Sequence, residues 1–104
     1  MNKLLFSEIQ ALKRQLLPDG KLILFGSQAR GDAREDSDWD LLVLLNKEGK
    51  HNWDDFDTYA FPFEEIGWEH GVTINPLLYT KEEWEKGVIF PFYKNVMLEG
   101  ILIN

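Results

Sequence analysis

The chain has 104 residues, of which 44% are hydrophobic and 13% aromatic, and this fits a single domain spanning 1–104 with a real core rather than a disordered segment. Cysteine is absent, which excludes disulfides, thiolate metal sites and a cysteine nucleophile. Eighteen acidic residues against eleven Lys and Arg give a formal charge of −7, which argues against a broad nucleic-acid-binding face. With no apolar run of membrane-spanning length and no signal-peptide core, we expect a cytoplasmic protein that does not contact membranes.

The first half of the sequence predicts one helix and two strands. Apolar residues recur at helical spacing over 2–17, and Pro18-Asp19-Gly20 ends this helix with turn residues. The apolar run 21–25 predicts a strand, followed by one helical turn over 27–31. The run 41–45 is apolar without alternation, which is typical of a central strand that is covered on both faces.

The segment 53–68 predicts a helix that begins after Asn52, a good N-cap residue. Pro62 should kink or split it. Its aromatic and apolar residues keep helical spacing, which favours core packing, although Phe61-Pro62-Phe63 could instead form a patch for a partner protein. The residues of the expected core face are Trp53, Phe56, Tyr59, Ala60, Phe63 and Ile66.

The remaining sequence predicts a third strand over 72–79, with Pro76 placing it at a sheet edge or bend. Thr80 and Glu83 form a capping box that opens a short helix. A last helix runs from about Phe90 to Leu98, and the apolar tail 101–103 should be buried or form a dimer contact. The expected class is α/β (α+β): a small mixed β-sheet packed against helices.

The stretch 22–45 carries the strongest functional signal. A buried strand ends at Gly26, where the missing Cβ lets the backbone turn and lets a ligand approach closely. Ser27 stands where the N-cap of a short helix is expected, and free N–H groups at such an end attract anions. The Gly-Ser turn is therefore a plausible seat for phosphate, although Gly-Ser alone is a common turn.

Asp38 and Asp40 open the next strand with one residue between them. On a strand their carboxylates would share one face, roughly 6 to 7 Å apart at Cα. Such a pair can hold a hard divalent cation such as Mg²⁺, which commonly arrives with substrate phosphates. On its own an Asp-x-Asp pair is more often a solvated strand entrance; its position after the Gly-Ser turn is what favours a metal site.

This order of residues resembles the signature of the DNA polymerase β-type nucleotidyltransferase superfamily, and closely that of the minimal nucleotidyltransferase (MNT) domain of bacteria. The signature reads G-S-x-A-R-G, a short polar spacer, and then S-D-x-D-L. The resemblance covers about a fifth of the chain. The matching residues are Gly26, Ser27, Ala29, Arg30, Gly31, Ser37, Asp38, Asp40 and Leu41.

The resemblance implies a transferase that moves a nucleoside monophosphate, AMP from ATP being the first expectation, onto a hydroxyl of a protein, an RNA or a small molecule. It implies Asp38 and Asp40 as ligands of two Mg²⁺ (or Mn²⁺) ions, with a third acid on a later strand. Gly26 and Ser27 would hold the β and γ phosphates of the nucleoside triphosphate. Arg30 and Ser37 would belong to the same nucleotide-binding segment.

The third acid is not evident in this sequence. The strand 72–79 offers only Thr73 and Asn75 at the corresponding place, and Glu69 could serve only if the register shifted. An Asn brings no charge and cannot act as a base, so the metal would be held weakly. The alternative reading is therefore a catalytically weak or inactive MNT-type antitoxin that binds a HEPN-domain partner. Separately, the sequence leaves open whether the chain forms a homo-oligomer.

Arg30 is open to two interpretations from the sequence. Its guanidinium could contact a triphosphate, or it could pair with Asp32, Glu35 or Asp36 and fix the connector. His51 and His70 have no second ligand at metal spacing, and we expect both to be surface residues.

Overall fold

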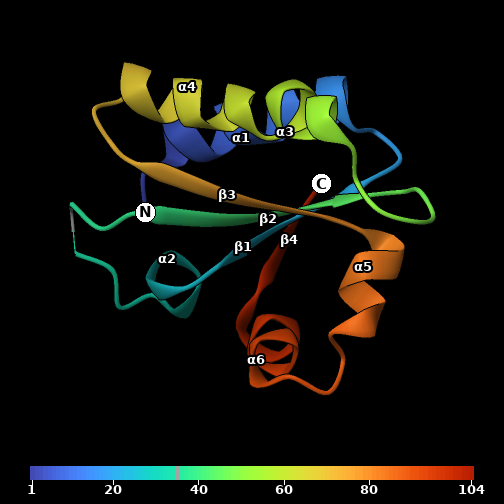
Figure 1. The fold of residues 1–104 in the computed structure, drawn as a ribbon. Helices are drawn as coiled ribbons and strands as arrows, with labels where there is room; N and C mark the ends of the chain where they lie inside the picture. The colour runs from blue at the N-terminus through green and yellow to red at the C-terminus, as the bar shows by residue number, and fades with distance from the viewer. Residues whose placement is uncertain (35) are drawn as a thin grey trace.

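The computed structural model describes residues 1–34 and 36–104, shown as a ribbon in Figure 1. Helices and strands alternate along most of the chain. The elements are α1 (Lys3–Leu16), β1 (Lys21–Phe25), α2 (Ser27–Arg30), β2 (Trp39–Leu45), α3 (Trp53–Tyr59), α4 (Phe61–Glu69), β3 (Ile74–Thr80), α5 (Lys81–Lys86), α6 (Pro91–Glu99) and β4 (Ile101–Ile103). None of the described helices is both long and apolar enough to cross a membrane.

The four strands form one mixed sheet in the order β3-β2-β1-β4. β1 runs antiparallel to both β2 and β4, whereas β2 and β3 are parallel. Every residue of β2 except Asp40 is buried, so the prediction of a strand covered on both faces is confirmed. The expected mixed sheet with helices against it is confirmed as well.

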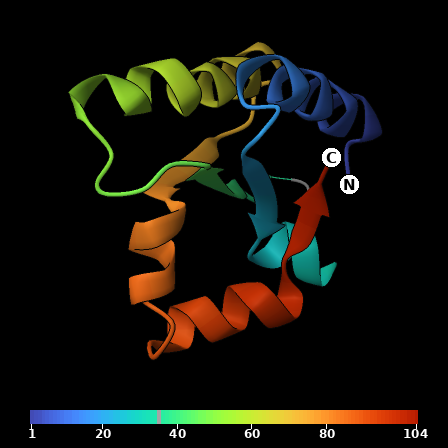
Figure 2. The same ribbon diagram turned by 90° about the vertical axis from the view of Figure 1, so that its right-hand side faces the viewer.

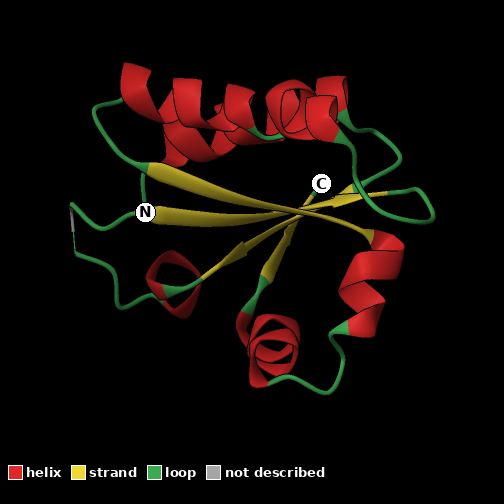
Figure 3. Cartoon of the chain, viewed as in Figure 1, coloured by secondary structure: helices red, strands yellow, loops and turns green. Residues whose placement is uncertain are grey.

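Helices cover the sheet on both sides, as Figures 1 and 3 show: α1, α3 and α4 lie on one face, and α2, α5 and α6 on the other. The alternation of side chains along each strand supplies one apolar cluster to each layer. The larger cluster, under α1, α3 and α4, includes Leu5, Ile9, Leu24, Leu41, Val43 and Phe63. The smaller cluster, under α5 and α6, is made of Ile23, Leu42, Leu44, Trp84 and Val96.

The predicted helix over 53–68 is split into two, as Pro62 suggested, with Ala60 between α3 and α4. Asn52 caps α3, and Asp55 folds back to accept from the Asn52 backbone amide at 2.8 Å. Asp55 is thereby turned inward, where it also pairs with Lys47 at 2.7 Å. Since the capped turn fixes the orientation of α3, Trp53 is left 97% exposed and Phe56 is also exposed, so their predicted place in the core is wrong.

The elements after α4 follow the sequence more closely. β3 is an edge strand that contains Pro76, as predicted. The capping box of α5 is present: the Thr80 hydroxyl accepts from the Glu83 amide at 3.1 Å, and the Glu83 carboxylate accepts from the Thr80 amide at 2.9 Å. The apolar tail forms β4 against β1, a strand that the sequence pattern did not reveal.

Candidate functional site

The turn after β1 is shaped by the missing side chain of Gly26. Its φ of 75° lies in the left-handed region, and it forms the N-cap of α2. A Cβ at this position would stand 2.4 Å from Asp40 Oδ2. Gly26 is thus required both by the backbone conformation and by the carboxylate beside it. The N-cap is Gly26 rather than Ser27, which is the first residue of the helix, contrary to the expectation from sequence.

Asp38 and Asp40 converge on one side chain, that of Asn75. The Asn75 Nδ2 group donates to Asp38 Oδ2 at 3.0 Å and to Asp40 Oδ1 at 3.3 Å. Both carboxylates therefore point to the same place, and Asp40 also lies against Gly26. The structure thus brings together the turn, the two acids and the residue that stands at the place of the expected third acid.

The sheet register explains this arrangement. The antiparallel pairing of β1 with β2 sets Phe25 opposite Asp40, and the parallel pairing of β2 with β3 sets Asn75 beside the same Asp40. Trp39 is 2% exposed and belongs to the cluster under α1, α3 and α4. Since side chains alternate along a strand, burying Trp39 turns Asp40 toward the opposite face.

The donor set fits one divalent cation better than two. Among the described residues, no three His, Cys, Asp or Glu side chains gather closely enough to hold a metal ion. Two converging carboxylates, together with an amide whose oxygen could replace its nitrogen after a side-chain flip, are hard oxygen donors of the kind Mg²⁺ accepts, with phosphate oxygens and water completing the shell. Asn75 does not supply the third charge that a second ion would need.

Ser37 forms hydrogen bonds within the connector between α2 and β2 and to α2. Its Oγ accepts from the Arg34 amide at 2.8 Å, and its carbonyl accepts from Gln28 Nε2 at 3.3 Å. Gln28 is buried, and it ties α2 to the residue just before Asp38. The sequence reasoning missed Gln28, although a polar residue inside the motif was the available signal.

Arg30 faces acids rather than the Gly-Ser turn. Its Nε lies 3.3 Å from Asp32 Oδ2 and its Nη1 lies 3.5 Å from Glu99 Oε2. The hydrogen bond and charge of Asp32, followed by those of Glu99, hold the pKa of Arg30 above its ordinary value. The pairing with Asp32 agrees with the structural interpretation, and Glu99 is a partner that sequence order could not suggest. Glu35 lies outside the described residues.

The two histidines pair with single carboxylates. His51 Nδ1 lies 2.9 Å from Glu83 Oε1, and His70 Nε2 lies 2.6 Å from Glu8 Oε2. Hydrogen bonds from His51 and from the Thr80 backbone outweigh the effect of burial and lower the pKa of Glu83. Neither histidine adds a ligand to the Asp38–Asp40 pair.

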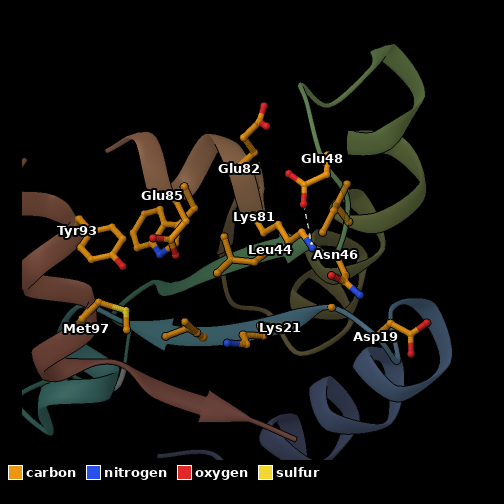
Figure 4. Close-up of a pocket in the computed structure, with 14 residues that line it drawn as sticks. Asp19, Lys21, Leu44, Asn46, Glu48, Lys81, Glu82, Glu85, Tyr93 and Met97 are labelled. Atoms are coloured by element: carbon orange, nitrogen blue, oxygen red, sulfur yellow. Dashed lines mark ion pairs between the residues drawn. The ribbon is translucent and has the colours of Figure 1, made fainter. Parts of the chain in front are cut away.

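A cavity of about 540 Å³ opens at the other end of the β1–β2 pair, between the sheet, α5 and α6 (Figure 4). Figure 4 shows Lys21, Leu44, Tyr93 and Met97 around it. Glu48, which lines it, pairs with Lys81 at 3.1 Å. The cavity holds none of the motif residues, and we place the candidate site at the Gly-Ser turn because that is where the acids converge.

Comparison with known families gives a match over most of the chain. Residues 8–103 match the family model described as "Nucleotidyltransferase domain". The match extends from α1 to β4 and includes the Gly-Ser turn, both aspartates and Asn75. It therefore covers far more of the chain than the motif alone.

Two individual proteins are similar to this chain. A protein of Methanocaldococcus jannaschii named "Putative protein adenylyltransferase" is 36% identical over 80 residues, which are 77% of this chain and 73% of that protein. A solved structure described as a toxin-antitoxin with AMP-PNP superposes with a TM-score of 0.65 over 100% of this chain and 73% of that one. Its sequence identity is 16%, so this second likeness shows the fold alone.

Proposed function

Because the chain belongs to the nucleotidyltransferase domain family, we propose that it transfers AMP from ATP onto a hydroxyl group of a protein, with Mg²⁺ or Mn²⁺ bound. The observation that supports this most is the convergence of Asp38 and Asp40 on the Asn75 amide beside Gly26. The name of the M. jannaschii relative supports AMP as the transferred group and a protein as the acceptor.

The residues of the chain have distinct parts in this proposal. Asp38 and Asp40 hold the cation and orient it toward the Gly-Ser turn. In α2 the amides of Ala29 and Arg30 donate to the Gly26 carbonyl, each at 3.1 Å, so the amides of Ser27 and Gln28 are the ones that receive the terminal phosphates, with Gly26 allowing the close approach. When bound, the cation would neutralise phosphate charge and lower the barrier to attack of the acceptor oxygen on the α-phosphorus. The bond from that phosphorus to the β-phosphate breaks, pyrophosphate leaves, and the hydroxyl proton passes to solvent water. Asn75 positions both carboxylates, and as an amide it does not accept the proton of the acceptor hydroxyl.

The direct test is incubation with labelled ATP, GTP, CTP or UTP, with Mg²⁺ or Mn²⁺, and with candidate acceptor proteins. We expect label transfer from ATP that Asp38→Asn and Asp40→Asn each reduce by at least about 100-fold, the scale of losing one group that acts on developing charge. Asp54→Asn is the matched control, since it removes an exposed carboxylate from α3. Transfer that survives in both site variants, or none from any nucleotide, would remove the enzymatic proposal.

A second candidate function rests on Asn75. With an amide where the family pattern has a third acid, the chain could act by binding a partner as an antitoxin, and the toxin-antitoxin structure with the same fold gives this reading its context. Its test is co-purification of the natively expressed chain with a HEPN-domain protein. A complex that is unchanged in Asp38→Asn and Asp40→Asn would favour association without transfer, whereas a lone chain would count against it.

A further inference from the structure

The C-terminal part of the chain carries an exposed apolar surface. Eight large apolar side chains of α6, β4 and the turn before α6 are exposed, with Leu98 at 84% and Ile89 at 77%. Exposed apolar side chains in such numbers within one short segment of the chain are typical of an interface. We call the exposed side chains at the end of α6 and on β4 the α6–β4 surface: Met97, Leu98, Ile101 and Leu102. Ile101 and Leu102 lie on opposite faces of β4, and the other four side chains lie in the turn before α6 and at the start of α6.

The α6–β4 surface has almost no charge. Residues 88–104 contain one basic side chain, Lys94, and one acidic side chain, Glu99, which cancel, so the whole formal charge of −7 lies in residues 1–87. Glu99 is moreover engaged by Arg30 at 3.5 Å. Two copies of so acidic a chain repel each other in most relative orientations. Contact through this surface avoids that repulsion, because it brings few acidic side chains of the two copies close together.

β4 adds a backbone feature to this surface. It is an outer strand of the sheet, paired with β1 on one side, and no described residue forms a strand on its other side (Figure 2). A free strand edge presents unpaired N–H and C=O groups that another strand can satisfy. An antiparallel pair of identical strands is self-complementary, as a two-fold dimer requires.

From these observations we infer that the α6–β4 surface is a dimer interface, in which β4 pairs with β4 of a second copy and the two sheets become continuous. Since β4 has three residues, full antiparallel pairing sets Leu102 opposite Leu102 of the other copy. Leu98, on α6, then packs across the two-fold axis. This dimer does not depend on the proposed transfer of AMP.

The mass of the chain in solution tests the inference. Sedimentation equilibrium over a dilution series should give twice the 12.2 kDa of one chain. Leu98→Lys and Leu102→Lys should each weaken dimerisation by at least about 10-fold, since each buries a charge at the contact. Leu4→Lys is the matched control, because Leu4 is 64% exposed on α1 and lies outside the surface. Circular dichroism should show all three variants folded.

The absence of native cysteine allows a second measurement. Leu102→Cys should form an intermolecular disulfide under mild oxidation, because directly opposed residues of antiparallel strands have the Cα separation a disulfide needs. Leu4→Cys should stay monomeric on a non-reducing gel. A monomer throughout the dilution series, alone or with a different protein on this surface, overturns the inference. The inference is also overturned if the chain dimerises but Leu102→Cys forms no intermolecular disulfide. It is likewise overturned if Leu4→Lys weakens dimerisation as much as Leu98→Lys and Leu102→Lys do.

Discussion

At the scale of single residues, the candidate site depends on glycine at position 26, which has no Cβ. The Gly26 Cα faces the Asp40 carboxylate so closely that no Cβ fits between them. Gly31 also has a positive φ, 81°, but its ψ of 11° places it in the ordinary left-handed helical region, and no atom lies within 4 Å of where its Cβ would be. Gly26 has a ψ of −156°, a conformation that essentially only glycine adopts, so it differs from Gly31 both in backbone conformation and in the crowding by Asp40.

We expect Gly31→Ala to lower the free energy of unfolding by about 1 to 2 kcal/mol, the cost of a left-handed conformation with a side chain. Gly26→Ala should lower it by about 1 to 3 kcal/mol more, because its backbone conformation is open essentially to glycine alone and because Asp40 must also move. Urea denaturation of both variants measures the difference. Equal losses would show that neither the backbone conformation of Gly26 nor its close approach to Asp40 adds to the cost.

Asn75 provides the second residue-scale prediction. Asn75→Asp replaces the bridging amide with a third carboxylate, so without metal it should lower the free energy of unfolding by about 1 to 3 kcal/mol. Added Mg²⁺ should raise the melting temperature of this variant more than that of the unaltered chain. Asn75→Ala is the control: it loses the same hydrogen bonds, and its melting temperature should not respond more to Mg²⁺. An identical Mg²⁺ response in all three would contradict a cation site here.

At the scale of elements, sequence was most informative where local rules decide the outcome. The turn at 18–20, the split at Pro62 and the capping box at Thr80 depend on neighbouring residues and were all predictable. The exposure of Trp53 was not, because helical spacing does not say which side of α3 meets the sheet; there Asp55 is turned inward, with its cap at Asn52 and its ion pair with Lys47. β4 was missed since a three-residue strand has no periodicity to detect and is defined by its pairing with β1.

In the candidate site, too, the residues set by a local motif were predictable and the contacts between distant segments were not. Gly26, Asp38 and Asp40 could be selected from sequence, because a short motif contains them all. The hydrogen bonds from Asn75 to Asp38 and Asp40 depend on the parallel register of β2 and β3. The ion pair of Arg30 with Glu99 joins residues 69 positions apart along the chain. Neither contact is indicated by neighbouring residues in the sequence.

The start of α3 gives a pH prediction. Burial raises the pKa of Asp55, but hydrogen bonds from Lys47 and from the Asn52 amide outweigh it, so the net pKa lies below its ordinary value. A carboxylate with a lowered folded-state pKa stabilises the protein above its unfolded-state pKa, about 3.9, and this stabilisation is lost as the pH falls through the folded-state pKa.

Asp55→Asn should therefore lower the free energy of unfolding by about 1 to 2 kcal/mol at neutral pH, the scale of a lost helix cap. The difference from the unaltered chain should be constant above about pH 5 and shrink below about pH 4. Denaturant titrations across this range measure it. Asp54→Asn, at an exposed neighbouring position, should show no such pH-dependent difference, and if it does, the effect does not belong to the Asp55 contacts.

At the scale of the whole molecule, the four tryptophans report on both layers. Trp39 and Trp84 are 2% and 6% exposed, in the two separate apolar clusters, whereas Trp53 and Trp68 are 97% and 63% exposed on α3 and α4. Fluorescence quenched by acrylamide should therefore come mainly from Trp53 and Trp68. The double variant Trp53→Phe, Trp68→Phe should retain emission that is blue-shifted and resistant to the quencher. Strong residual quenching would mean that one of the two clusters is open to solvent.

The pairing of β4 with β1 also bears on how the molecule is made. During translation α1, β1 and β2 emerge early from the ribosomal tunnel. One edge of β1 stays unpaired until β4 has emerged as well, and Ile103 of β4 follows its partner Leu22 by some eighty positions. Nascent chains that still lack β4 leave one edge of β1 with unpaired N–H and C=O groups. A synonymous change that slows elongation within 90–103 would prolong this interval without altering the finished protein.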